Sequence, residues 1–173
     1  PPGFELLEGN RLVLLGPSHI DVGGSLWSAL HGLNSGELID VDLETHKVLA
    51  DLVRSLVSDG IIDGIHDLSA GGLGVALAEM VAKSKFGITV ARIPDALSLF
   101  GEGPSRVLVS INSENVNELL SRAESANIPT TRLGLVGGDR FIVKDLIPAS
   151  SPRDSCKREV FIFFLSAHLK YIL

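Results

Sequence analysis

A polar turn that opens into an apolar helix constrains the fold of this chain most strongly. The stretch runs from Ile65 to Met80 and reads IHDLSAGGLGVALAEM. β-Branched residues approach the turn and apolar residues follow it at helical spacing, so the pattern predicts a strand end, a turn and a helix start. Ser69 is the predicted N-cap of this helix.

The glycines of this turn indicate a possible ligand site. Gly71 and Gly72 would leave backbone N–H groups open at the positive end of a helix, where an anion such as phosphate binds favourably. A tight turn without a ligand explains the same residues, and the pair His66 and Asp67 suits either a hydrogen-bonded turn or a functional site. The stretch by itself leaves both interpretations open.

A second glycine loop with the same arrangement lies earlier in the chain. It joins a strand predicted over 11–15 to a short helix predicted over 26–30. Its candidate ligand-binding residues are Asp21, Gly23, Gly24 and Ser25. The spacing matches neither a Walker loop nor a dinucleotide fingerprint. The two loops are therefore either tight turns of a packed domain or the two walls of one anion-binding cleft.

Composition narrows the fold class and argues against several kinds of partner. The 173 residues are 45% hydrophobic but only 5% aromatic and include 18 glycines, which is typical of one α/β domain. A net charge of −6 without a basic cluster argues against nucleic acid. No signal peptide or membrane-spanning run is predicted. The single Cys156 suits a reducing cytoplasm, and no zinc-ligand set is present.

Periodicity predicts a mixed β-sheet covered by helices, an α/β fold of the α+β type. Apolar faces predict covering helices over 42–58 and 113–126, the second with Ser113 as its N-cap. Alternating or strongly apolar runs predict further strands, over 86–93, 107–111, 130–136 and 140–143, and the run 107–111 is apolar enough to lie centrally in the sheet. The turn Gly137-Gly138-Asp139 predicts a hairpin between the last two strands.

Two further segments have more than one interpretation. Glu102 and Arg106, before the 107–111 strand, suit a loop ion pair, which we favour, or a contact to a hydroxyl or phosphate. The segment from Ala149 is polar at first and densely apolar over 160–165. It either adds an edge strand or docks on a partner, or it is not native to the domain.

Three motifs, in order and at matching spacing, resemble the phosphoribosylformylglycinamidine synthase family. HDLSAGGL from His66 resembles the family's HDVSDGGL turn, and DVGGS from Asp21 resembles its ELGGS loop. LFGE from Leu99, with Ser105-Arg106, resembles its LFSE and Arg stretch. The likeness covers about residues 11–143 and points to the C-terminal domain of the second half of the synthetase subunit. That family is part of the superfamily related to aminoimidazole ribonucleotide (AIR) synthase.

The resemblance implies a domain organisation and a reaction. It implies a linker from a missing N-terminal domain over 1–10, an AIR synthase-like C-terminal domain over 11–147 and an atypical tail over 148–173. The implied enzyme is an ATP-dependent ligase of de novo purine biosynthesis, which converts formylglycinamide ribonucleotide and glutamine-derived ammonia to formylglycinamidine ribonucleotide. The complete enzyme would use ATP or ADP with Mg²⁺. Its implied partners are the missing N-terminal synthetase domains, a glutaminase subunit and a small accessory subunit.

The resemblance also implies which residues lie near the nucleotide. They are Asp21, Gly23, Gly24, Ser25, His66, Asp67, Ser69, Gly71 and Gly72. No residue of this chain is expected to be catalytic or to hold a metal, because those groups would lie in the missing domains, and the isolated chain is expected to be inactive. Ala70 stands where the family has a second acidic residue, which weakens the case for metal or phosphate chemistry at this turn. The stretch Gly101-Glu102-Gly103-Pro104 lacks the Glu-Ser-Gln arrangement that the first of the family's two repeated modules uses at its substrate, which indicates the second, less catalytic module.

Two other functions remain open at this point. One is a nucleotide-binding scaffold module that contributes an interface and no turnover. The other is a related synthetase or kinase domain, of the AIR synthase or selenophosphate synthetase type, with another substrate. Selenium chemistry typically needs a reactive cysteine, and Cys156 lies in the atypical tail.

Overall fold

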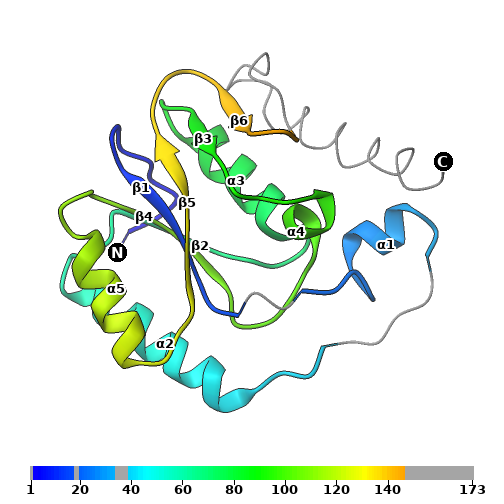
Figure 1. Ribbon diagram of the computed structural model, residues 1–173, viewed down its shortest axis with the longest axis horizontal. Helices are drawn as coiled ribbons and strands as arrows, with labels where there is room; N and C mark the ends of the chain where they lie inside the picture. Colours follow the sequence, from blue (N-terminus) through cyan, green and yellow to red (C-terminus); the bar gives the residue numbers. More distant parts are fainter. Residues whose placement is uncertain (1, 18–19, 34–38, 147–173) are drawn as a thin grey trace.

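The computed structural model describes residues 2–17, 20–33 and 39–146, which form a mixed six-stranded sheet with helices on both faces (Figure 1). The elements follow in the order β1 (Arg11–Leu15), α1 (Leu26–Leu30), α2 (Leu43–Ser58), β2 (Gly64–Asp67), α3 (Gly72–Lys83), β3 (Ile88–Val90), α4 (Ala96–Phe100), β4 (Val107–Ile111), α5 (Val116–Ser125), β5 (Thr130–Val136) and β6 (Phe141–Val143). Ser18, His19 and the predicted tail over 148–173 lie outside the described residues. The predicted fold class is confirmed.

The strand order is β2-β4-β1-β5-β3-β6, and every neighbouring pair is antiparallel except β3 and β6. The strand β4 lies between β2 and β1, so its predicted position inside the sheet is confirmed. Successive side chains of a strand point to opposite faces. In β1 this places Leu12 and Leu14 in one core and Val13 and Leu15 in the other.

Each face of the sheet has its own layer of helices and its own core. Helices α2 and α5 lie together on one side, where Leu52 and Leu119 are buried against β1 and β4. Helices α3 and α4 cover the other face, and Leu77 and Phe100 are fully buried there (Figure 1). Burying a side chain of this size contributes about 1.5–3 kcal/mol, so the two cores hold the sheet from both sides.

The start of α2 agrees with the prediction. The Asp42 side chain is its N-cap and accepts hydrogen bonds from the N–H groups of Glu44, at 3.0 Å, and Thr45, at 3.3 Å. The hydroxyl of Thr45 adds a bond to the same carboxylate at 2.6 Å. These bonds favour the charged carboxylate, and they hold the pKa of Asp42 below its ordinary value, the bond from the Thr45 hydroxyl contributing most.

Two predicted N-caps are wrong. Helix α3 starts at Gly72 with Gly71 as its N-cap, in the left-handed conformation and without a side-chain cap, so the Ser69 hydroxyl does not cap it. Helix α5 starts at Val116 after Asn115, three residues beyond the predicted cap Ser113. A separate turn precedes α5, because the Asn112 side chain accepts a hydrogen bond from the N–H of Glu114.

The predicted hairpin between 130–136 and 140–143 is also wrong. Strand β6 pairs with β3 in parallel and not with β5. Gly87 explains the difference: its N–H donates to the carbonyl of Gly138 at 2.8 Å, and its carbonyl accepts from Gly137 at 2.9 Å. A Cβ at Gly87 would lie 2.1 Å from the carbonyl oxygen of Arg140, so only glycine allows this approach. The predicted strand 86–93 therefore shortens to β3.

Residues 2–10 contain no helix or strand but contact the domain. Leu6 is buried in the core, and the carbonyl of Gly3 accepts a hydrogen bond from Ile65 at 2.8 Å. The boundary between the linker and the domain stays a prediction. Within the described part of the chain, every helix is too short or too polar to traverse a lipid bilayer.

Candidate functional site

The two glycine loops and the loop after α4 meet at one cavity of about 420 Å³. Four residues predicted from the sequence line it: Asp21, Gly23, Gly24 and Ser69. The rest of the lining is Ile39, Val41, Leu68, Ala70, Glu102, Gly103 and Pro104. Segments distant in sequence therefore form one concave surface, which we call the three-loop cleft.

The first loop is held by its own polar side chains. Oδ1 of Asp21 accepts hydrogen bonds from the N–H groups of Val22, at 2.6 Å, and Gly23, at 2.7 Å. Such a bond to the backbone two residues on forms an Asx turn. Ser25 is buried behind the loop, where its Oγ caps α1 by accepting from the N–H of Ser28 at 3.1 Å. Ser25 therefore shapes the loop without lining the cleft.

The second loop is a tight turn whose N–H groups are already bonded. Gly71 donates to Oε1 of Glu102 at 2.8 Å, and Gly72 donates to the carbonyl of Ser69 at 3.0 Å. Both glycines have positive φ, +82° and +60°. A Cβ on Gly72 would lie 2.5 Å from the carbonyl oxygen of Gly101. The N–H groups expected to be open to an anion are therefore bonded within the protein.

Glu102 has a role in this site that the sequence did not predict. Its Oε1 accepts from the N–H of Leu26 at 2.9 Å, as well as from Gly71. Its backbone forms an isolated bridge with Asp21, with both N–H···O distances 2.9 Å. Its position in the motif from Leu99 and its nearness in sequence to Arg106 indicated a functional or paired carboxylate but no contact to either glycine loop.

Arg106 does not form the predicted ion pair with Glu102. In the described part of the chain, no salt bridge joins the two, so the favoured interpretation of this loop is wrong. Arg106 is buried, with only 5% of the residue exposed. Its Nη1 donates a long hydrogen bond, of 3.4 Å, to the carbonyl of Gly101, and its Nε has no hydrogen-bond partner among the described residues. Burial without a counter-charge lowers the pKa of this guanidinium.

His66 and Asp67 do not line the three-loop cleft. His66 is buried, with Nε2 3.0 Å from Oε2 of Glu79 on α3 and Nδ1 2.6 Å from the carbonyl oxygen of Asp67. Neighbouring side chains of a strand point to opposite faces, and the Asp67 side chain is 78% exposed. A ligand contact by either residue stays a prediction.

The electrostatics of the cleft limit what it can hold. Among the described residues, its lining includes two carboxylates, from Asp21 and Glu102, and no lysine or arginine. Within the described ranges, no three His, Cys, Asp or Glu side chains are grouped so that they could bind a metal ion. A polyphosphate in this cleft needs its counter-charge from another source.

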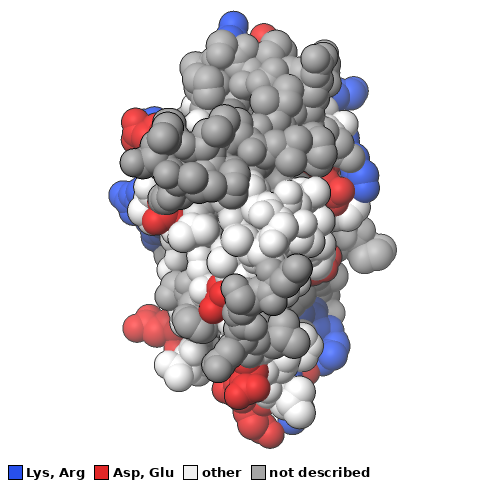
Figure 2. Space-filling model, turned by 90° about the vertical axis from the view of Figure 1, so that its right-hand side faces the viewer, with Lys and Arg blue, Asp and Glu red and all other residues white. Residues whose placement is uncertain are grey.

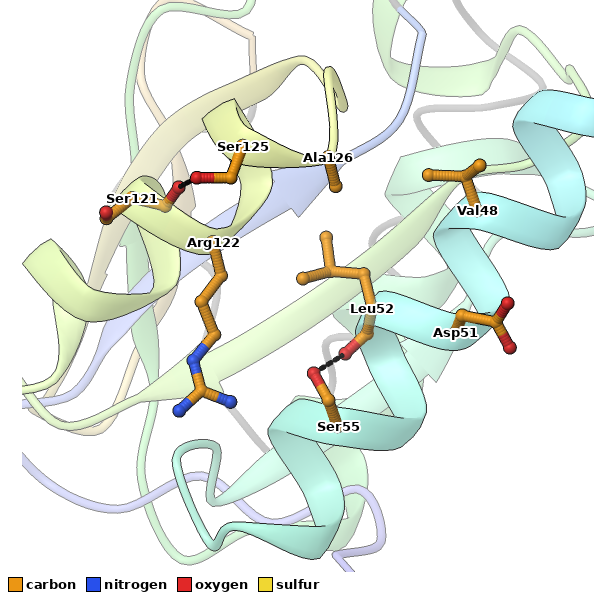
Figure 3. Close-up of a pocket in the computed structure, with 8 residues that line it drawn as sticks. All are labelled: Val48, Asp51, Leu52, Ser55, Ser121, Arg122, Ser125 and Ala126. Atoms are coloured by element: carbon orange, nitrogen blue, oxygen red, sulfur yellow. Dashed lines mark hydrogen bonds between the residues drawn. The ribbon is translucent and has the colours of Figure 1, made fainter.

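A larger cavity, of about 490 Å³, lies between α2 and α5 (Figure 3). Two of its hydroxyls are bonded within their helices: Ser55 donates to the carbonyl of Leu52 and Ser125 to that of Ser121, each at 2.8 Å. Arg122 bonds the carboxylates of Asp59 and Glu118, which raises its pKa. None of the residues predicted for the site lies here, so the three-loop cleft is the better candidate.

The side of the molecule that carries α1 has few charges near its centre. Figure 2 shows uncharged side chains there, with acidic and basic ones toward the margins. On α1 and just after it, Leu26, Leu30 and Leu33 are 40%, 42% and 46% exposed. This helix therefore presents apolar side chains beside the cleft.

Comparison with known proteins gives consistent matches. Phosphoribosylformylglycinamidine synthase subunit PurL of Zymomonas mobilis subsp. mobilis is 39% identical over 141 residues, which are 78% of this chain and 19% of that protein. The subunit of the same name from Allorhizobium ampelinum is 36% identical over 141 residues, 79% of this chain and 19% of that protein. The chain spans about a fifth of the length of these curated relatives.

Solved structures show the same fold at lower sequence identity. Thermotoga maritima PurL complexed with ATP has a TM-score of 0.70 and 20% identity, covering 90% of this chain and 27% of that one. The hydrogenase maturation protein HypE has a TM-score of 0.57 and 20% identity, covering 83% and 49%. Residues 8–145 match the family described as AIR synthase related protein, C-terminal domain. The chain therefore belongs to the AIR synthase related protein family, of which it contains the C-terminal domain.

Proposed function

We propose that this chain is the C-terminal domain of the second half of a phosphoribosylformylglycinamidine synthase. The complete ligase would convert formylglycinamide ribonucleotide, glutamine-derived ammonia and ATP to formylglycinamidine ribonucleotide. Two relatives that carry this enzyme's name, at 36% and 39% identity, support the proposal. They do so over one domain only, so the reaction of the whole protein is part of the proposal.

The observation that carries the proposal is the convergence of three motifs on one cavity. The motifs that start at Asp21, His66 and Leu99 each contribute a segment to the three-loop cleft. Three loops from separate parts of a chain need not share a concave surface if each is only a turn. Ligand sites in proteins are typically concave and combine several segments, which favours a ligand at this position.

The ligand that we propose for the cleft is part of ATP or ADP with Mg²⁺. Gly24 has no side chain, so a phosphate can approach its backbone closely, and Ser69 adds a hydroxyl-bearing residue to the lining. The described residues fit a nucleotide only if its charge is offset, because the lining has no cation. A magnesium ion that arrives with the nucleotide would supply that charge. Solved PurL structures complexed with ATP and ADP share the fold.

We propose that the chain acts only together with other domains and subunits. No described residue can be assigned a catalytic role, and the apolar side chains of α1 suit contact with a partner domain. The proposed partners are N-terminal synthetase domains, a glutaminase subunit and a small accessory subunit, in the cytoplasm. A solved structure of PurLQS from Thermotoga maritima, with a TM-score of 0.68, supports an assembly of this kind.

The second candidate function is a scaffold module, which would bind a nucleotide without turning it over. Two observations favour it: the N–H of Gly71 is already bonded to Glu102, and Ala70 lines the cleft where the resemblance implies an acidic residue. Both reduce the capacity of this turn for phosphate or metal chemistry. The two candidates share the cleft and differ in whether the bound nucleotide reacts.

Calorimetric titration with Mg-ADP and Mg-ATP tests the proposed cleft. The variant Gly24→Val places a branched side chain at a cleft residue with φ +67°, and Gly60→Val introduces the same residue at φ +66° beyond α2. Both substitutions strain the backbone, but only the first alters the cleft. We expect binding to the wild type and to Gly60→Val and loss of binding in Gly24→Val. Equal affinities of all three proteins, or no binding to the wild type, would contradict the proposal.

A further inference from the structure

The carboxylate of Glu102 lies between the two glycine loops and bonds both. One oxygen, Oε1, accepts from the N–H of Leu26 at 2.9 Å and from that of Gly71 at 2.8 Å. These two residues are separated from Glu102 by 76 and 31 positions in the sequence. A single side chain therefore joins three segments that come together only in the folded protein.

The two N–H groups are of the kind that bind anions. Gly71 is the N-cap of α3, a helix of 12 residues, and Leu26 is the first residue of α1. A negative charge at a helix N-terminus is favoured by the unpaired N–H groups and by the helix dipole. Hydrogen bonds to a charged acceptor are also about twice as strong as neutral ones. The carboxylate therefore occupies the position beside Gly71 at which one of the two interpretations of the sequence places a phosphate.

Among the described residues that line the cleft, Asp21 is the other acidic one, and its carboxylate is engaged elsewhere. Oδ1 of Asp21 is bonded to the N–H groups of Val22 and Gly23 within its own loop. The bridge between the backbones of Asp21 and Glu102 fixes the start of the Glu102 side chain relative to the first loop. Of the two described acidic residues that line the cleft, Glu102 is the one that bonds the N–H groups at the starts of both helices.

We infer that Glu102 is a positioning residue whose carboxylate serves as the built-in anion of the three-loop cleft. It holds the two glycine loops together, and it keeps the N–H groups of Leu26 and Gly71 from bonding a ligand phosphate. A phosphate in the cleft would instead approach Gly24 and Ser69, because the N–H of Gly23 is already bonded to Asp21. The contact between loops is independent of any ligand, whereas the exclusion of phosphate from Gly71 rests on the proposed function.

Three variants separate this role from a general contribution to folding. Glu102→Gln keeps an oxygen acceptor but removes the charge, Glu102→Ala removes both, and Glu114→Ala removes an exposed carboxylate before α5 as the matched control. Backbone amide resonances of Leu26 and Gly71 are followed by NMR. We expect their proton shifts to move upfield slightly in Glu102→Gln, strongly in Glu102→Ala and not at all in Glu114→Ala.

Chemical rescue provides the readout that a purely structural role would not give. Sodium formate, with sodium chloride as the ionic-strength control, is titrated into each protein. We expect formate to return the Leu26 and Gly71 resonances of Glu102→Ala toward their wild-type positions with saturation, and to leave the wild type unchanged. Absence of rescue in a folded Glu102→Ala protein would overturn the inference.

A measurement on the wild type covers the case in which Glu102→Ala does not fold. Inorganic phosphate is added while the same two amides are observed. We expect no shift at Leu26 or Gly71, and a saturable shift at either would overturn the inference. The variant and rescue measurements involve no nucleotide, so they remain decisive if the proposed nucleotide site fails.

Discussion

Gly72→Ala is expected to destabilise the domain strongly, because two separate costs fall on this position. Its φ of +60° is left-handed, which costs a non-glycine residue about 1–2 kcal/mol. The added Cβ would also lie 2.5 Å from the carbonyl oxygen of Gly101, a backbone atom that cannot move freely. Forcing such an approach costs about 1–3 kcal/mol, so we expect a loss of about 2–5 kcal/mol in the free energy of unfolding.

Gly60→Ala is the control for the backbone cost alone. Gly60 has a φ of +66° and nothing within 4 Å of an added Cβ, so its loss should stay at about 1–2 kcal/mol. Urea unfolding followed by circular dichroism measures both. With a slope of about 2 kcal/mol per M, a further 2 kcal/mol lowers the midpoint of Gly72→Ala by about 1 M more than that of Gly60→Ala. Equal midpoints for the two variants would refute the argument that close packing of Gly72 on Gly101 positions the turn.

Three further predictions concern single groups and the chain as a whole. The fold lowers the pKa of Asp42 from its ordinary value of 3.8, so the charged carboxylate should stabilise the fold above pH 3.8. This stabilisation should be lost as the pH falls through the lowered pKa. Asp42→Ala should therefore reduce the melting temperature at pH 7, and the difference in melting temperature between the variant and the wild type should become smaller in acid. Arg106→Met should leave the urea midpoint equal or higher, since it removes a buried cation that lacks a counter-charge, and a marked drop would contradict this. The isolated chain should form no amidine from formylglycinamide ribonucleotide, ammonia and Mg-ATP in a discontinuous product assay, and any robust turnover would contradict the need for further domains.

Elements with a strong local pattern were predictable from the sequence. The apolar face of α2 depends on residues close together in the chain, and the helix is present over nearly the predicted range. The partner of β6 was not predictable, because the contacts of Gly87 with Gly137 and Gly138 outweigh the local hairpin signal of the glycine turn. Helix α4 was missed for a related reason: it is only five residues long, and its cap Asp95 follows a proline that reads as a turn.

The loops that form the site were predictable from the sequence, but the hydrogen bonds that join them were not. Glycine spacing and motif order indicated the two loops, and Asp21, Gly23, Gly24 and Ser69 do line one cleft. The role of Glu102 was hidden because its partners are backbone N–H groups, which any residue except proline carries. A sequence pattern can indicate which side chains pair by charge, but it cannot identify a backbone donor far along the chain.

The most direct test of the account is to map which backbone amide resonances of the isotope-labelled chain shift when Mg-ADP is added. The account predicts saturable shifts that cluster at residues 21–24, 68–70 and 102–104, around the three-loop cleft. Shifts that cluster instead at 48–55 and 121–126, along the cavity between α2 and α5, would contradict it. An unchanged spectrum at saturating Mg-ADP would contradict it as well.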